Sequence, residues 1–278
     1  SRRPMLSIQA ALRQGSRLLE EGAVTAPRLT AEVLLCHALG REKAYLYAHP
    51  EEELSEAAWV HYGRCLYERL GGKPTQYITR KQEFYGREFQ VTPDVLIPRP
   101  ETEHVVERAI ALRRRRVVDV GCGSGAIAVS VRLETGAEVW ATDLSEAAVR
   151  VAAANARRLG ARVHFAVCDV LEAIAPGSMD LVVSNPPYVP VRDRGGLPRE
   201  IVEHEPHLAL FGGESGFDIY QRLIAGARRV LQPGGWLIME LNYQFEQPVR
   251  EMLSGWLDID VQRDLAGLPR VISARLGP

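Results

Sequence analysis

Thirteen residues, VVDVGCGSGAIAV at 117–129, constrain the fold more than any other part of the sequence. They read as a buried strand, a glycine-rich turn and the start of a helix. Gly121 and Gly123 let the backbone approach a ligand closely, and Gly125 lets the helix pack tightly on the strand. Because Gly121, Gly123 and Ala126 also fit G-x-G-x-x-G/A, the turn alone does not separate NAD from other adenosine-containing ligands. A tight turn without any ligand is a further alternative.

Helical stretches alternate with short apolar runs over residues 99–278. The runs are RVVDV, AEVWATD, RVHFAV, DLVVSN, GGWLIMEL, DIDVQ and RVISARL. Alternating helices and strands are typical of a parallel sheet that carries helices on both faces. The fold class predicted for this part of the chain is therefore α/β, with a doubly wound, mostly parallel sheet.

The first part of the chain has a different pattern. Residues 5–74 are predicted to form a small helical bundle, in which Gly22 and Gly40 suit helix ends and Ser55 suits a helix start. Residues 75–98 alternate aromatic or β-branched with polar residues, which predicts a hairpin that links two domains. We expect the bundle to recognise the substrate and the α/β part to hold the chemistry.

Composition and charge restrict the classes of partner. The chain has 278 residues, 46% of them apolar and 25% charged, and a formal net charge of −1, so we do not expect nucleic acid as a partner. No apolar run approaches the ~20 residues that cross a bilayer, and no secretory leader is recognised, so we expect no membrane contact and a cytoplasmic location. Cys36, Cys65, Cys122 and Cys168 make no CxxC pair, which favours buried reduced thiols over disulfides or a zinc site.

Two more strand ends carry groups that suit an adenosine ligand. Asp143 ends the second strand, where a carboxylate can accept hydrogen bonds from both hydroxyls of a ribose. Asp169 ends the third strand and can meet an adenine amino group, while Val170 offers an apolar wall. Ligands of open α/β sheets lie beyond the carboxyl ends of the strands, so these groups are expected to share one site.

The fourth strand ends in Asn185-Pro186-Pro187-Tyr188. Two consecutive prolines cannot donate to a sheet and they fix the backbone, so a stiff turn is one explanation of this segment. After three strand ends that suit an adenosine ligand, a second explanation fits better. An NAD enzyme has no evident use for such a cluster, whereas a methyltransferase does.

The pattern resembles the class I S-adenosylmethionine-dependent methyltransferases, which have a seven-stranded sheet, and among them those that methylate planar nitrogens. Over nearly the whole chain it is similar to the protein-glutamine N5-methyltransferases of the PrmC/HemK family, which act on peptide chain release factors. The segments that carry this resemblance are residues 74–107, DVGCGSGAIAV, ATDLSEAAV, SNPPYVP, EPHLALFGGESGFDIYQRLI and DLAGLPRVISARL. IPRPETE at 97–103 favours release factors over a ribosomal-protein glutamine as substrate.

The resemblance implies methyl transfer from S-adenosylmethionine to the glutamine amide nitrogen of the Gly-Gly-Gln motif in a release factor, without a metal. It implies that the Asn185 side-chain oxygen and the Pro186 carbonyl accept the two amide N–H bonds, while Tyr188 packs against the flat amide. The expected substrate-binding residues are Asn185, Pro186, Pro187 and Tyr188. The expected cofactor-binding residues are Gly121, Cys122, Gly123, Ser124, Gly125, Asp143, Leu144, Asp169, Val170 and Asn185.

The sequence departs from the family pattern at three places. Cys122 stands where threonine is common, and Val170 where some relatives have an aromatic residue, which weakens stacking on adenine. MELNYQ at 239–244 replaces a more usual Glu-Ile-Gly segment.

His204 and His207 have a spacing that suits a metal, but no third ligand with convincing spacing follows.

Several alternatives stay open. The acceptor can be a ribosomal-protein glutamine or an exocyclic amino group of a DNA or RNA base, because a flipped base also presents a planar NH₂. A non-catalytic adaptor with a degenerate cofactor domain is another reading. Glu101 and Glu103 either close the cofactor pocket or complement a helix N-terminus. Phe84 and Tyr85 either form the apolar face of the hairpin or contact the substrate.

Overall fold

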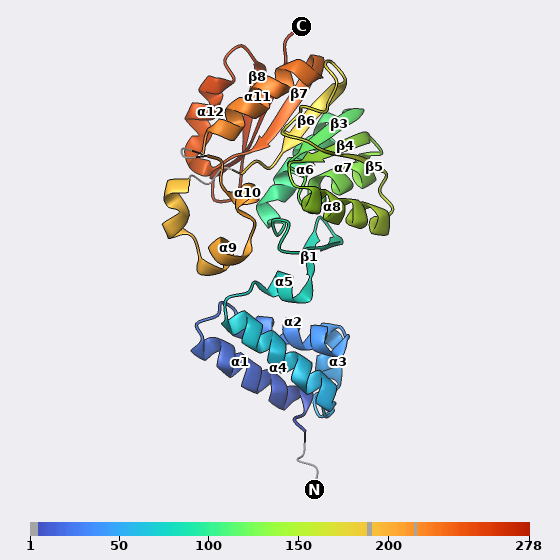
Figure 1. The fold of residues 1–278 in the computed structure, drawn as a ribbon, viewed down its shortest axis with the longest axis vertical. Helices are drawn as coiled ribbons and strands as arrows, with labels where there is room; N and C mark the ends of the chain where they lie inside the picture. The colour runs from blue at the N-terminus through green and yellow to red at the C-terminus, as the bar shows by residue number, and fades with distance from the viewer. Residues whose placement is uncertain (1–4, 188–190, 214–215) are drawn as a thin grey trace. The chain divides into compact units, whose positions relative to one another are not determined.

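The computed structural model divides into two compact units (Figure 1). The described residues are 5–187, 191–213 and 216–278. The smaller unit comprises Ser1–Arg80 and Arg199–His204, and the larger comprises Lys81–Pro198 and Glu205–Pro278. In the part of the chain that is described, no helix combines the length and the apolar character that crossing a bilayer requires.

The smaller unit is helical around one apolar core. Its helices are α1 (Ile8–Glu21), α2 (Pro27–Leu39), α3 (Lys43–Ala48), α4 (Glu56–Leu70), α5 (Thr75–Thr79) and α9 (Arg199–His204). Leu12, Leu34 and Tyr62 are buried in this core. Ser55 begins α4 as expected, because its hydroxyl accepts a hydrogen bond from the backbone N–H of Ala58 at 3.1 Å.

Two short helices of this unit were not anticipated. α3 has six residues, too few for a helical period to show, and the burial of its Leu46 stabilises it. α5 occupies the start of the segment expected to be a hairpin, because Pro74 precedes it and the side chains of Tyr77 and Ile78 are buried. The hairpin is therefore shorter than 75–98. It consists of β1 (Lys81–Phe84) and β2 (Arg87–Gln90) and belongs to the larger unit.

The larger unit is built on a seven-stranded sheet, so the predicted α/β fold class is confirmed. Its strands are β3 (Arg116–Val120), β4 (Glu138–Asp143), β5 (Val163–Val167), β6 (Met179–Ser184), β7 (Leu231–Glu240), β8 (Leu257–Arg263) and β9 (Pro269–Arg275). The order is β5-β4-β3-β6-β7-β9-β8, and β9 runs antiparallel to both of its neighbours while the other pairs are parallel.

Helices cover both faces of this sheet, as Figure 1 shows. Alternate residues of a strand point to opposite faces, so Leu181 and Val183 of β6 pack on one side and Val182 on the other. The first side holds α6 (Glu103–Leu112), α7 (Ala126–Thr135) and α8 (Glu146–Leu159). The second side holds α11 (Asp218–Val230) and α12 (Glu246–Met252). The remaining short helices are η1 (Pro100–Thr102), η2 (Val191–Gly196), α10 (His207–Leu210) and η3 (Tyr243–Phe245).

Asn155 of α8 ties the glycine-rich turn to the hairpin. This fully buried side chain donates to the carbonyls of Ser124 (2.8 Å) and Gln90 (2.9 Å), and its oxygen accepts the N–H of Gln90 at 2.8 Å. Three backbone groups in the protein interior thus depend on the Asn155 side chain for their hydrogen bonds. The turn that follows β3 is held in position from behind by this side chain.

We expect Asn155→Ala to lower the free energy of unfolding of the larger unit by ~2–4 kcal/mol, because it leaves these backbone groups unpaired in the interior. Urea unfolding followed by tryptophan fluorescence measures this, since three of the four tryptophans, Trp140, Trp236 and Trp256, lie in that unit. The exposed Arg150→Ala on the same helix is the control, with a loss of at most ~0.5 kcal/mol. Equal losses for the two variants would contradict the role given to Asn155.

Candidate active site

A cavity of about 620 Å³ lies at the carboxyl ends of the parallel strands. Ten of the predicted residues line it: Gly121, Cys122, Gly123, Ser124, Asp143, Leu144, Asp169, Val170, Asn185 and Pro187. Two others, Gly125 and Pro186, are not part of the lining, and Tyr188 lies outside the described residues. The sheet thus brings together residues from the ends of β3, β4, β5 and β6, whose functional roles stay predictions.

The glycine-rich turn opens directly onto this cavity. Gly121 and Gly123 have φ values of 71° and 52°, which favour glycine, and a Cβ on either would meet nothing within 4 Å. The N–H groups of Gly121 and Cys122 donate to the Thr142 carbonyl at 2.8 and 2.9 Å, which fixes the turn on the end of β4. The backbone therefore leaves free space on its open side, where a ligand can approach it closely.

Gly125 has a different task. Its φ is 85°, and a Cβ at this position would stand 3.2 Å from the Cβ of Ala152 in α8. A contact that short requires a neighbour to move, so the absence of a side chain lets α7 and α8 approach each other. The structure gives Gly125 a packing role and no direct place in the cavity wall.

Asp143 is held at the cavity wall by two backbone groups. Its Oδ2 accepts the N–H of Gly123 at 3.0 Å and its Oδ1 accepts the N–H of Ser145 at 2.9 Å. Each carboxylate oxygen has a second lone pair, so the side chain keeps the capacity to accept two further hydrogen bonds. This arrangement suits the two hydroxyls of a ribose.

The carboxylate of Asp169, after the third strand of the sequence, already has a hydrogen-bond partner, which the sequence did not indicate. Asp169 Oδ2 accepts a hydrogen bond from Arg222 of α11 at 2.6 Å, so a ligand amino group competes with that guanidinium. Val170 has φ 52°, an outlier for a β-branched residue, and the Thr142 hydroxyl holds its carbonyl at 2.8 Å. Strained backbone of this kind occurs where the surroundings impose it, often beside a ligand.

The amide of Asn185 belongs to a chain of hydrogen bonds that begins at Glu240, the last residue of β7. The Thr102 hydroxyl donates to Glu240 Oε1 at 2.7 Å, and Asn185 Nδ2 donates to Thr102 Oγ1 at 3.3 Å. Glu240 and Thr102 are both 4% exposed. As a carboxylate Glu240 only accepts, so it takes the single proton of the hydroxyl, and Thr102 can then only accept from Asn185.

This order of protons fixes the direction of the amide. Asn185 must turn its NH₂ toward Thr102, which leaves its Oδ1 on the other side. Oδ1 is buried and has no hydrogen-bond partner among the described residues, although Asn185 lines the cavity. A buried oxygen without a donor is costly in a finished protein, so it marks a place prepared for an N–H group of a ligand.

The sequence drew attention to Glu101 and Glu103, whereas Thr102 between them reaches the cavity. Glu103 Oε1 accepts the N–H of Tyr85 at 2.8 Å, and both acids stand in the first turns of η1 and α6, in agreement with the helix N-terminus reading. Phe84 is buried in the core, as expected for the apolar face of the hairpin. The sequence did not single out Glu240, although a charged residue at the end of an apolar strand is a recognisable sign of a site residue.

Glu205 was also missed, and it fastens the segment before η1. Its carboxylate is almost fully buried, accepts the N–H of Ile97 at 3.1 Å and pairs with Arg99. Arg99 in turn donates to the Ile97 carbonyl at 2.8 Å. Leaving the buried Glu205 carboxylate without these partners is costly, so the contact holds IPRPETE beside the cavity that Thr102 lines.

His204 and His207 fall into different units, and neither belongs to a metal-ligand group among the described residues. His207 lines the cavity and packs edge-on against Phe211, with ring centroids 5.5 Å apart. That methyl transfer needs no metal stays a prediction.

Asp119, beneath the glycine-rich turn, is a further residue that the sequence did not single out. It is 0% exposed, its Oδ2 accepts the N–H of Ala128 at 3.1 Å, and its Oδ1 has no partner among the described residues. Burial raises the pKa of Asp119 from 3.8 to about 7, and the nearby charge of Asp143 acts in the same direction. Between pH 3.8 and about pH 7, the folded protein therefore keeps a proton on Asp119 that the unfolded chain has already released.

Because the pKa is raised on folding, Asp119 makes the protein less stable as the pH rises from about 4 to about 7. Asp119→Asn keeps the acceptor for Ala128 without the charge. We expect its free energy of unfolding, relative to the parent protein, to rise by ~1–3 kcal/mol between pH 5 and pH 8. Urea unfolding at both pH values measures the difference, and a constant difference would contradict the raised pKa.

Models of two known families match the two parts of the chain. The PrmC N-terminal domain matches residues 10–79, and the methyltransferase small domain matches residues 101–214. Among solved structures, a methyltransferase from Pyrococcus furiosus aligns with a TM-score of 0.54 and 17% identity over 70% of this chain and 91% of that one. The hMettl16 catalytic domain, solved in complex with the MAT2A 3′UTR hairpin 1, aligns with a TM-score of 0.55 and 16% identity over 84% and 87%. These likenesses show the methyltransferase fold.

Relatives of the whole chain are much more similar in sequence. The release factor glutamine methyltransferase of Koribacter versatilis is 44% identical over 97% of this chain and 99% of its own length. That of Moorella thermoacetica is 40% identical over 97% and 98%. Because such identities extend over nearly the full length of both chains, this protein belongs to the family of the release factor glutamine methyltransferases.

Proposed function

We propose that this protein transfers a methyl group from S-adenosylmethionine to the side-chain amide nitrogen (N5) of the glutamine in the Gly-Gly-Gln motif of peptide chain release factors. The family to which the chain belongs supports the substrate class. The observation that carries the assignment within the structure is the buried, unpartnered Oδ1 of Asn185 in the cavity wall. A primary amide brings two N–H groups, of which one satisfies that oxygen.

The cavity lining fits the adenosyl cofactor. The backbone of Gly121 and Gly123 leaves open space, Asp143 keeps two acceptor positions for ribose hydroxyls, and Leu144 and Val170 add apolar surface. When bound there, S-adenosylmethionine supplies a methyl group that its cationic sulfur activates. The protein has to hold the acceptor and exclude water, and it needs no acid or base of its own for this.

The difficulty lies in the acceptor, because an amide nitrogen shares its lone pair with the carbonyl group and is a poor nucleophile. Asn185 Oδ1 and the backbone carbonyl of Pro186 would each accept one N–H of the glutamine amide. Two acceptors on one side of the NH₂ group tilt the nitrogen toward tetrahedral geometry and direct its lone pair. Proline fixes the direction of its carbonyl, and Pro186 is buried at the end of β6.

After transfer, the nitrogen has gained a bond and carries a positive charge. Its acidity rises, and the proton leaves through the same acceptor oxygens to water. Holding the reacting atoms in line supplies several kcal/mol of the barrier, so orientation replaces a charged base. Tyr188 is proposed to pack against the flat amide, on the strength of the family motif.

The helical unit is proposed to grip the release factor, because the reactive glutamine must arrive on a projecting loop. We retain residues 5–74 as the recognition bundle, 75–98 as the linking segment and 99–278 as the methyltransferase domain. We also propose the cytoplasm as the site of action, since all four cysteines are free thiols.

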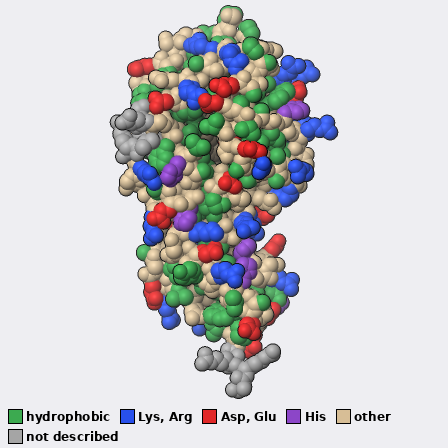
Figure 2. All heavy atoms as spheres, in the orientation of Figure 1, with side chains coloured by type: hydrophobic (Ala, Val, Ile, Leu, Met, Phe, Trp, Pro, Cys, Tyr) green, Lys and Arg blue, Asp and Glu red, His purple; other side chains and the backbone are tan. Residues whose placement is uncertain are grey.

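Peptide mapping by mass spectrometry of a release factor incubated with the protein and cofactor tests the proposal. One added methyl on the glutamine of the Gly-Gly-Gln motif is expected. A labelled-methyl assay with DNA, RNA and ribosomal protein beside the release factor covers the other acceptors. On the face drawn in Figure 2, acidic and basic side chains are interspersed, an unfavourable surface for a nucleic acid. Preferential labelling of a nucleic acid would overturn the proposal.

Asn185→Ala is expected to lower the rate of transfer by ~100-fold or more, because the glutamine loses the acceptor that orients it. Its affinity for S-adenosylmethionine, measured by isothermal titration, should stay within a few-fold of the parent protein. Asp143→Ala is the converse test, because this variant should weaken cofactor binding by ~1–3 kcal/mol. Comparable losses of affinity in both variants would assign Asn185 to the cofactor pocket.

Thr102→Val is expected to lower kcat by ~10–100-fold, because it removes the hydroxyl that orients the Asn185 amide while the side-chain shape is kept. Cofactor affinity should change little, and Thr102→Ser, which restores the hydroxyl, should recover most of kcat. Steady-state kinetics with a release factor gives the values. A Thr102→Ser variant as slow as Thr102→Val would show that the hydroxyl is not sufficient to restore kcat, and it would contradict the role given to the proton chain.

A further inference from the structure

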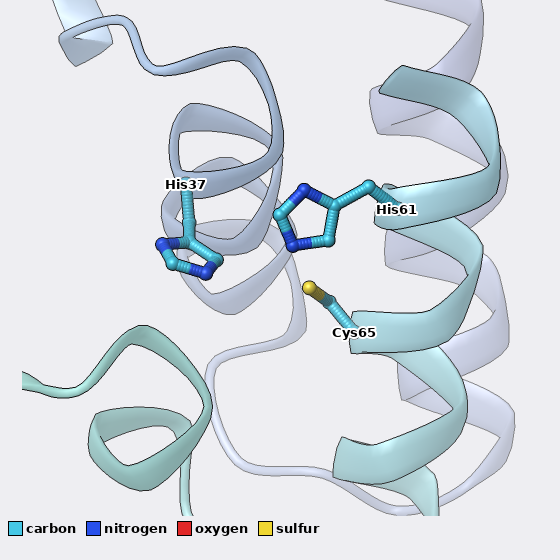
Figure 3. A group of neighbouring side chains, drawn as sticks. All are labelled: His37, His61 and Cys65. Atoms are coloured by element: carbon cyan, nitrogen blue, oxygen red, sulfur yellow. The ribbon is translucent and has the colours of Figure 1, made fainter. Parts of the chain in front are cut away.

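We propose that His37, His61 and Cys65 of the helical unit form a binding site for a divalent transition metal, with Zn²⁺ as the first choice. These residues are far from the predicted catalytic set in sequence. Their donor atoms, one from each side chain, all lie within 4.8 Å of one another. Figure 3 shows the two imidazole rings and the thiol extending into the same space between two helices.

The helices produce this cluster in a simple way. His61 and Cys65 are four residues apart on α4, so they lie on one face of that helix one turn from each other. His37 comes from the last turn of α2, which packs against α4 in the same core. Its ring meets that of His61 edge-on, with centroids 5.2 Å apart and an interplanar angle of 66°. The cluster thus joins two helices through side chains that already converge.

The donor set matches the preference of zinc. Imidazole nitrogen and thiolate sulfur bind Zn²⁺ at about 2.0 to 2.3 Å, so donors around one ion stand about 3.5 Å apart. The present separations, up to 4.8 Å, exceed this by about 1 Å, which side-chain rotations can close. Both histidines are half-buried. A hard cation such as Mg²⁺ would instead require oxygen ligands.

Burial separates the roles of the three donors. Cys65 is 3% exposed among Tyr62, Leu66 and the other core residues, so its sulfur is available only from within the cluster. The half-buried imidazoles give the ion a path from solvent. On binding, two nitrogen–metal bonds and one sulfur–metal bond form, and the thiol proton leaves to water. Three protein ligands leave a fourth position for a water molecule.

An ordinary packing contact is the competing explanation, since buried cysteines are common in cores. It accounts for Cys65 alone but gives no reason for two imidazoles to turn toward the same sulfur. A bound ion would link α2 to α4 and stabilise the helical unit by preferring the folded state. All three ligands come from this unit, so the site is independent of methyl transfer.

Cobalt titration of the purified full-length protein tests the proposal, because a cobalt–thiolate bond gives a charge-transfer absorption that nitrogen ligands do not. We expect one Co²⁺ per chain with this absorption, displaced by Zn²⁺, and a thermal unfolding midpoint that rises with Zn²⁺. Cys65→Ser should abolish the absorption and the rise. His37→Gln and His61→Gln should each weaken binding at least ~10-fold, the least expected for loss of a ligand.

Two control variants change a cysteine and a histidine elsewhere in the same helical unit. Cys36→Ser changes the cysteine next to His37, and His49→Gln changes an exposed histidine; both should bind cobalt like the parent protein. Circular dichroism establishes which variants keep their helices, and the two His→Gln variants decide the matter if Cys65→Ser does not fold. No cobalt–thiolate absorption in the parent protein, or its persistence in Cys65→Ser, would overturn the proposal. So would its loss in Cys36→Ser.

Discussion

The direction of one amide, that of Asn185, depends on a single hydroxyl proton of Thr102. Glu240 accepts the hydrogen bond from that hydroxyl because a carboxylate has no proton to donate, so Thr102 can only accept from Asn185. The three residues come from three separate elements: η1, the end of β6 and the end of β7. Correct placement of the acceptor oxygen therefore requires that the whole sheet and the segment before α6 be in position together.

The parallel sheet explains why these elements meet. Strands β3, β4, β5, β6 and β7 run in one direction, so all their carboxyl ends lie at one edge. This edge also collects left-handed backbone, at Gly121, Gly123 and Val170. Glycine adopts it without strain, whereas Val170 needs the Thr142 hydroxyl and the packing around it. Among the residues that line the cavity, Val170 is therefore the one whose backbone is held in a conformation that its side chain disfavours.

The sequence was sufficient for features that repeat locally. Apolar runs marked the strands, and the residue after each run marked the cavity wall, which is why Asp143 and Asn185 could be named in advance. Residues whose partners are distant in sequence gave no such pattern. Thr102 is 138 residues from Glu240, and Ile97 is 108 from Glu205. For α3 and α5 the segments are short and burial decides, which no local period reports.

The two buried cysteines, Cys65 and Cys122, show that the chemical role of a side chain depends on the groups around it as well as on its residue type. Burial, with the charges of Asp119 and Asp143 added, holds the pKa of Cys122 well above its ordinary value, so this thiol stays neutral beside the glycine-rich turn. It acts there as a small apolar side chain, which fits its place in the cavity wall. Cys65 is just as enclosed, and burial, with the charge of Glu68 added, raises the pKa of its thiol too, but two imidazoles lie beside it. Composition alone treats both as inert, whereas only at Cys65 do the surrounding groups add the donors that a metal ion needs.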